Sequence, residues 1–135
     1  MSYPILSIEG VCPQIAAKLK AVGVRTTATL LERAKDPKGR KTLAAASGIA
    51  ESRILQFANI ADLMRIRGVG AEYSELLEAA GVDTVKELKN RNPANLTKAI
   101  LELNAARQLV RLPPSTKTVS KWISQAKTMP PMMTY

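Results

Sequence analysis

The amino-acid sequence predicts a compact all-α protein made of two tandem copies of one helical unit. Three observations carry this prediction. They are an internal repeat, apolar residues at helical spacing, and the lack of any alternating apolar and polar stretch long enough for a strand. A chain of 135 residues can bury enough surface to fold without a metal or a disulfide. Its one cysteine, Cys12, has no partner for an internal disulfide.

The repeat becomes visible when the chain is aligned with itself. Residues 8–30 match residues 66–88 at the separation of Gly10 from Gly68, which includes Gly23-Val24 over Gly81-Val82. Further along, the match continues at the larger separation of Ile54 from Val119. The second copy is therefore the longer one, and we expect its extra residues near positions 111–115. The predicted organisation is a first unit at residues 3–61, a second unit at residues 62–127 and a flexible tail at residues 128–135.

Each unit is predicted to hold two short hairpins between helices. The first hairpin is Gly10–Cys12, and Thr26 is placed to cap a later helix of that unit. The second hairpin is Gly48–Ala50, and the helix after it carries Ile54 and Phe57 toward the core.

The third hairpin is Gly68–Gly70, where two glycines bracket Val69 and permit the tight turn. The helix that follows ends at Gly81, and Asp83 or Thr84 caps the next one, with Glu87 three residues after Thr84 as in a capping box. A fourth hairpin is expected at Leu112-Pro113-Pro114, before a helix that buries Trp122.

Composition argues against an enzyme and against a cofactor. The chain has no histidine, no set of metal ligands and no phosphate-binding loop of the Gly-x4-Gly-Lys type. It has no apolar run long enough to span a membrane and no signal-peptide pattern at Met1-Ser2-Tyr3-Pro4. We therefore expect a cytoplasmic protein without a membrane partner, which would be nucleoid-associated if it binds DNA.

The charge balance favours a polyanionic partner. The formal net charge is +9, and no acidic residue follows Glu102. Two basic groups stand out: Lys35, Lys38, Arg40 and Lys41 form one, and Arg107, Arg111, Lys117, Lys121 and Lys127, all after Glu102, form the other.

The segment Ile66-Arg67-Gly68-Val69-Gly70 resembles the helix-hairpin-helix motif, in which an apolar-Gly-apolar-Gly sequence precedes a helix. The pattern from Gly10 through Gly48-Ile49-Ala50 is similar to the double helix-hairpin-helix domain at the N-terminus of archaeal and eukaryotic recombinases. The whole chain also resembles a mainly bacterial and cyanobacterial family of tandem helix-hairpin-helix units, domain of unknown function 4332.

This resemblance implies a sequence-nonspecific DNA-binding site. In such hairpins, backbone N–H groups and the following helix N-terminus bind a phosphate of DNA or RNA. Lys and Arg side chains add attraction that salt weakens. The candidate residues in this chain are Arg65, Arg67, Gly68, Val69, Gly70 and Ala71 at the third hairpin, Gly10, Val11 and Cys12 at the first, Gly48, Ile49 and Ala50 at the second, and the basic residues Lys38, Arg40, Lys41, Lys117 and Lys121.

Other features favour a protein-interaction or scaffold role without nucleic acid. Pro13 removes one N–H donor after the first hairpin. The helix after the third hairpin carries Glu72, Glu75 and Glu78, which would repel phosphate unless they face away. Both functions therefore remain open at this stage. If the third hairpin binds DNA, Gly68→Glu combined with Gly70→Glu is expected to weaken binding without unfolding the chain.

Overall fold

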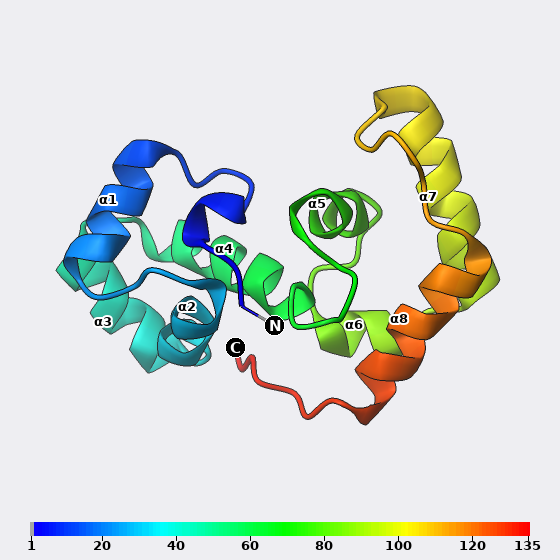
Figure 1. Cartoon of the computed structure of the whole chain (residues 1–135). Helices are drawn as coiled ribbons and strands as arrows, with labels where there is room; N and C mark the ends of the chain where they lie inside the picture. Colours follow the sequence, from blue (N-terminus) through cyan, green and yellow to red (C-terminus); the bar gives the residue numbers. More distant parts are fainter. Residues whose placement is uncertain (1) are drawn as a thin grey trace.

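The computed structural model describes residues 2–135, which Figure 1 shows as two groups of helices side by side. The predicted compact all-α fold is confirmed, because the described residues form eight α-helices, one 3₁₀ turn and only an isolated β-bridge between Pro4 and Thr26. The first unit contains η1 (Ile5–Ser7), α1 (Pro13–Ala21), α2 (Thr27–Ala34), α3 (Pro37–Ser47) and α4 (Glu51–Leu63). The second contains α5 (Ala71–Ala79), α6 (Val85–Lys89), α7 (Pro93–Arg107) and α8 (Thr116–Thr128). Within residues 2–135, no helix is both long and apolar enough to cross a membrane.

The helix starts follow the capping residues in the sequence. The Thr26 hydroxyl accepts a hydrogen bond from the Thr29 backbone N–H at 3.3 Å, and the Thr84 hydroxyl accepts one from the Glu87 N–H at 3.2 Å. Each bond satisfies an N–H group that has no partner inside its helix. Asp36, Asn92 and Ser115 cap α3, α7 and α8 in the same way.

Helix bounds and hydrogen bonds follow the register of the repeat. Helices α1 and α5 each have 9 residues, and α4 and α8 each have 13. Before α1, the Val11 N–H donates to the Ile8 carbonyl at 3.1 Å. Before α5, the Val69 N–H donates to the Ile66 carbonyl at the same distance. The two copies therefore build the same turn from equivalent residues.

The extra residues of the second copy lie in two places rather than one. Helix α7 has 15 residues where α3 has 11, and a longer loop follows α7. The residue after α3 is Gly48, with a φ angle of 75°, and the residue after α7 is Gln108, with a φ angle of 51°. The fourth turn therefore begins at Gln108, upstream of the predicted Leu112-Pro113-Pro114.

Each unit has its own hydrophobic core. Phe57 is 1% exposed in the first core, and Trp122 is 2% exposed at the equivalent place in the second, as predicted. Tyr73 packs against Trp122 with ring centroids 5.2 Å apart, and its hydroxyl donates to the Leu112 carbonyl at 3.0 Å. This contact holds the long loop against the second core.

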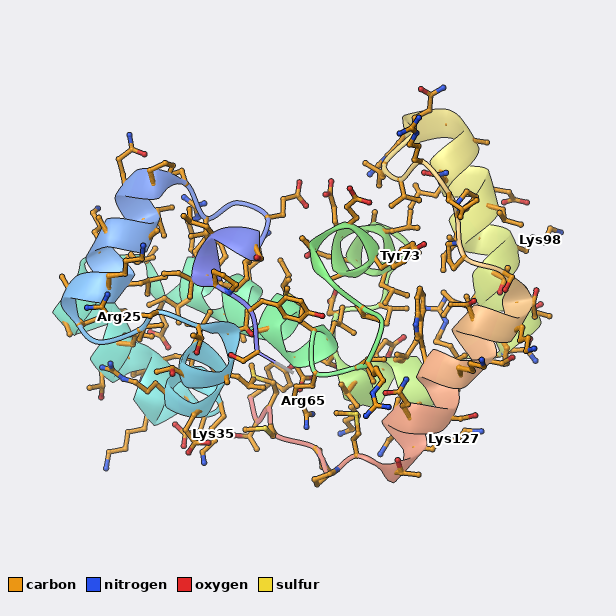
Figure 2. All side chains as sticks on the ribbon, in the orientation of Figure 1. Arg25, Lys35, Arg65, Tyr73, Lys98 and Lys127 are labelled. Carbon is orange, nitrogen blue, oxygen red and sulfur yellow. The ribbon has the colours of Figure 1, made fainter. Side chains whose placement is uncertain are left out.

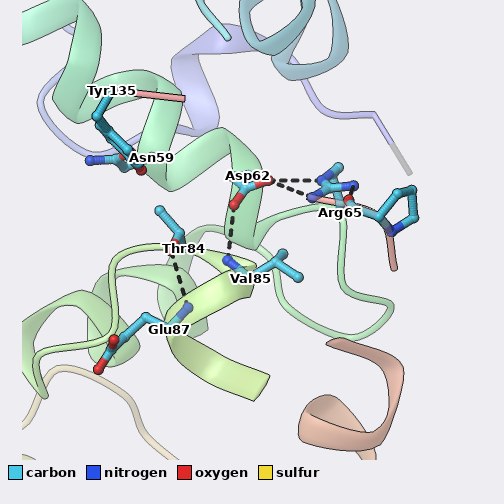
Figure 3. A network of polar contacts seen from close by, with 8 residues as sticks. Asn59, Asp62, Arg65, Thr84, Val85, Glu87 and Tyr135 are labelled. Atoms are coloured by element: carbon cyan, nitrogen blue, oxygen red, sulfur yellow. Dashed lines mark hydrogen bonds and ion pairs between the residues drawn. The ribbon is translucent and has the colours of Figure 1, made fainter. Parts of the chain in front are cut away.

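The two units are joined through the buried carboxylate of Asp62 (Figure 3). One carboxylate oxygen accepts hydrogen bonds from Nε and Nη2 of Arg65 at 2.9 and 2.7 Å. The other accepts the Val85 backbone N–H at 2.9 Å, at the start of α6. Asp62 therefore ties the end of α4 to the second unit.

Residues 128–135 were expected to form a flexible tail; in the structure Thr128 ends helix α8, and residues 129–135 lie against the first unit (Figure 1). The Thr134 N–H donates to the Lys35 carbonyl at 2.8 Å, and the Tyr135 hydroxyl donates to Asn59 Oδ1 at 2.9 Å. Met133 is 9% exposed and belongs to the first core. Burial of this side chain and the backbone hydrogen bonds together give the segment a defined position.

Candidate nucleic-acid interface

The third hairpin is fixed against helix α8. Gly68 has a φ angle of 93°, and a Cβ atom built there would lie 3.3 Å from Trp122 Nε1. The side-chain amide of Gln125 accepts from the Arg67 N–H at 2.9 Å and donates to the Arg67 carbonyl at 3.2 Å. Because Gln125 satisfies both backbone groups of Arg67, the Arg67 backbone is held against α8. Val69 is fully buried beneath the turn.

An open hollow of about 630 Å³ lies beside this hairpin, and we call it the α8 groove. Three cationic residues line it, Arg67, Lys117 and Lys121, and all three are exposed. No ion pair involves these three side chains within residues 2–135. The other lining residues are Ser120, Ser124 and Gln125.

The sequence of α8 explains why the groove is uniformly basic. Lys117 and Lys121 are four residues apart, as are Ser120 and Ser124, so helical geometry places them on one face. The opposite face is apolar and carries Trp122 into the core. No acidic residue follows Glu102, so this helix has no carboxylate to neutralise its lysines.

The structure brings together three of the predicted basic residues and separates the others. Arg67, Lys117 and Lys121 line the α8 groove, and Arg67 directly precedes the third hairpin in the chain. Arg65 lies between the units, paired with Asp62, and its Nη1 donates to the Pro130 carbonyl at 3.2 Å (Figures 2 and 3). Its charge is therefore used inside the molecule.

Arg40 does not contribute to a basic surface. The residue is 4% exposed, and its guanidinium donates to the carbonyls of Ala34 at 2.9 Å and Thr134 at 2.7 Å. It also lies over the Tyr135 ring. The tail was not expected to pack here, so the sequence placed Arg40 with its exposed neighbours Lys38 and Lys41.

The first two hairpins lie on the first unit, away from the α8 groove. Val11 and Ile49 are each 6% exposed, so their side chains belong to the core. Gly10, Gly48 and Ala50 are exposed backbone positions, with Ala50 at the start of α4. Cys12 is exposed at the start of α1, where hydrogen bonds from backbone groups, Ile15 first, lower the pKa of its thiol.

The glutamates of α5 lie partly in the seam between the units. Glu75 hydrogen-bonds Glu9 of the first unit, and burial together with this acidic neighbour raises the pKa of Glu75. Glu78 lies against α4 and hydrogen-bonds Gln56, and burial raises its pKa. Glu72 is exposed in the first turn of α5. None of the three lines the α8 groove.

Three residues of the α8 groove were not predicted from the sequence, namely Ser120, Ser124 and Gln125. The four-residue spacing of the serines beside the lysines is the signal that could have found the first two. Gln125 could not be found this way, because its role depends on the tertiary contact with Arg67.

Comparison with known proteins identifies the family of this chain. A family model described as "Domain of unknown function (DUF4332)" matches residues 9–129. No curated protein and no solved structure matches significantly. The matched residues include both units, from the first hairpin through helix α8. The chain therefore belongs to the DUF4332 family.

Proposed function

We propose that this protein is a non-enzymatic, sequence-nonspecific DNA-binding protein that contacts backbone phosphates through its second unit. The observation that supports this function is the α8 groove, where Arg67, Lys117 and Lys121 stand exposed and unpaired next to the third hairpin. Clustered cations attract DNA through release of its condensed counterions, which does not depend on sequence.

The third hairpin adds neutral donors a few residues after Arg67. Helix α5 begins at Ala71, directly after Gly70, and its first N–H groups have no partner inside the helix. A phosphate at this position would accept hydrogen bonds while Arg67 supplies charge. Contacts of this kind position a protein on DNA without reading bases.

The first test is fluorescence anisotropy of a labelled DNA duplex at about 50 and 200 mM salt. With three phosphate contacts, the logarithm of the association constant should fall with the logarithm of salt at a slope of about −2.7. Affinity should therefore decrease about 40-fold over this range. A wild-type protein that does not bind the duplex at the lower salt would refute the proposed function.

The structure sharpens the choice of hairpin variant. Gly68→Glu is unsuitable, because the positive φ angle of Gly68 strains any other residue and the new side chain would press on Trp122. Gly70 has a φ angle of −101°, which all residues adopt, so Gly70→Glu keeps the fold and places a carboxylate at the start of α5. We expect this variant to bind DNA at least about fivefold more weakly, with Gly70→Gln as the uncharged control. Equal binding by Gly70→Glu and wild type would remove the hairpin from the mechanism.

A second candidate function is the docking of an acidic protein, and one observation favours it. The face of α4 equivalent to the groove face of α8 makes a protein contact within this chain, against Glu78 and Asp83. Capture of an acidic protein by the α8 groove, together with no binding of duplex DNA, would support this function instead.

A further inference from the structure

Helices α4 and α8 present equivalent faces to different surroundings. The α4 face consists of Ser52, Leu55, Gln56 and Asn59, and it lines a hollow of about 190 Å³. In the register of the repeat, these positions correspond one by one to Lys117, Ser120, Lys121 and Ser124 of the α8 groove. The same side of the same helix is therefore hollowed in both units.

In the first unit, this face holds an acidic side chain. Glu78 and Asp83 of the second unit close the hollow over α4, and the Gln56 amide hydrogen-bonds the Glu78 carboxyl group. Glu78 Oε2 is buried there without a hydrogen-bond partner among residues 2–135. The Gln56 amide on this helix thus marks a place where a carboxyl group is bound.

In the second unit, the equivalent face is open and more strongly basic. Lys121 replaces Gln56, and Lys117 replaces Ser52, so two neutral positions become cationic. No part of residues 2–135 covers them in the way that Glu78 and Asp83 cover α4.

Charge disfavours a second copy of this chain on the α8 face. If another molecule continued the stack, its first unit would take the place that the second unit takes on α4. The residues equivalent to Glu78 and Asp83 are Lys20 and Arg25, which would face Lys117 and Lys121. This arrangement brings four cations together, so charge disfavours self-association and favours an anionic partner.

We propose that the α8 face binds an external anion at the place where α4 holds the Glu78 carboxyl group. Resting on the proposed function, that anion is a phosphate of the DNA backbone. Lys121 is the principal contact, Lys117 one helical turn away binds a neighbouring phosphate, and the Ser124 hydroxyl donates a hydrogen bond. The DNA lies across α8 on the side where the second unit lies across α4.

The sharpest test gives α8 the side chains of α4. The double variant Lys117→Ser with Lys121→Gln should weaken binding of the duplex at least about tenfold near 100 mM salt. It should also reduce the magnitude of the salt slope by about 1.8, because two phosphate contacts are lost. The matched control is Lys98→Gln with Lys127→Gln, which removes two exposed lysines elsewhere on the second unit (Figure 2). This control should change affinity less than about twofold.

The outcomes separate this inference from the proposed function. If wild type binds the duplex and both double variants weaken this binding equally, the α8 site is refuted. DNA binding would then depend on the overall positive charge alone. A first double variant that binds like wild type would also refute the site. A third outcome is that the wild type does not bind the duplex but binds poly-glutamate, and that the first double variant abolishes this binding. This outcome would overturn phosphate as the ligand and reject DNA binding.

Discussion

Helices α4 and α8 have the same length and the same place in their units, yet one is enclosed and the other is open. Seven residues of α4 are buried, including Asp62, whereas four residues of α8 are buried, all on its apolar face. The difference arises because the second unit packs on this face of α4, whereas nothing among residues 2–135 covers the equivalent face of α8. The same helix of the repeat is therefore an internal contact in one copy and an open surface in the other.

The largest difference between the two helices is expected at Asp62 and its equivalent, Lys127. Asp62→Ala would leave the Arg65 guanidinium and the Val85 N–H without their shared acceptor. We expect a loss of about 3 kcal/mol in the free energy of unfolding, measured with urea. Lys127→Ala on exposed α8 should change it by less than about 0.5 kcal/mol. Similar losses in both variants would contradict the joining role of Asp62.

The tail gives the first unit a second feature that the other unit lacks. Arg40→Ala would remove hydrogen bonds to the Ala34 and Thr134 carbonyls, and we expect a loss of about 2–3 kcal/mol. The loss should be clearly smaller in a chain truncated after Pro130, because one acceptor is already absent. Lys38→Ala is the exposed control and should be close to neutral. An unchanged Arg40→Ala effect after truncation would show that Arg40 does not hold the tail.

The residues that end α3 and α7 provide a matched pair with opposite expected signs. Gly48→Ala would force a Cβ atom into the left-handed region and should cost about 1 kcal/mol. Gln108→Gly relieves the same strain at the equivalent place and should stabilise the fold by somewhat less than that. Chemical unfolding of both variants measures the two changes. Destabilisation by Gln108→Gly would mean that the Gln108 side chain contributes more than its backbone costs.

The smallest expected effect concerns the seam carboxylates. The pKa of Glu75 is raised by burial and by Glu9, so its contribution to stability is present at acidic pH. It is lost as the pH rises from the ordinary glutamate range through the raised value. Glu75→Gln should therefore reduce the decrease in the free energy of unfolding between the ordinary glutamate pKa and the raised Glu75 pKa. It should also stabilise the fold slightly at neutral pH. Glu102→Gln on exposed α7 is the control, and a pH dependence unchanged by Glu75→Gln would exclude this carboxyl group as its source.

Local patterns in the sequence were sufficient to predict the helical framework. Thr26 and Thr84 cap helices because their hydroxyls reach the N–H group three residues on, a contact decided within one turn. The repeat then placed Phe57 and Trp122 at equivalent core positions. In the candidate site, charge predicted Arg67, Lys117 and Lys121 as binding residues. The sequence did not predict that they line one groove.

Long-range contacts explain what the sequence did not reveal. Arg40 is buried because residues near Thr134 pack over it, and no local pattern links positions so far apart. The fourth turn begins at Gln108, a residue type that rarely adopts the left-handed conformation. The prediction relied on glycine and proline as turn residues, so it placed this turn at Leu112-Pro113-Pro114 instead. Glu78 was read as a possible repeller of phosphate, whereas packing of α5 on α4 places it in the seam.

The docking of the tail has a consequence for synthesis on the ribosome. The first unit leaves the exit tunnel early, but Met133 completes its core and Thr134 bonds to Lys35, 99 residues upstream. Until residues 133–134 are made, helices α1–α4 therefore have an incomplete core, and Arg40 bonds to the Ala34 carbonyl but lacks its second acceptor, the Thr134 carbonyl. Final packing of the first unit therefore depends on residues made after the second unit, which couples the folding of the two units.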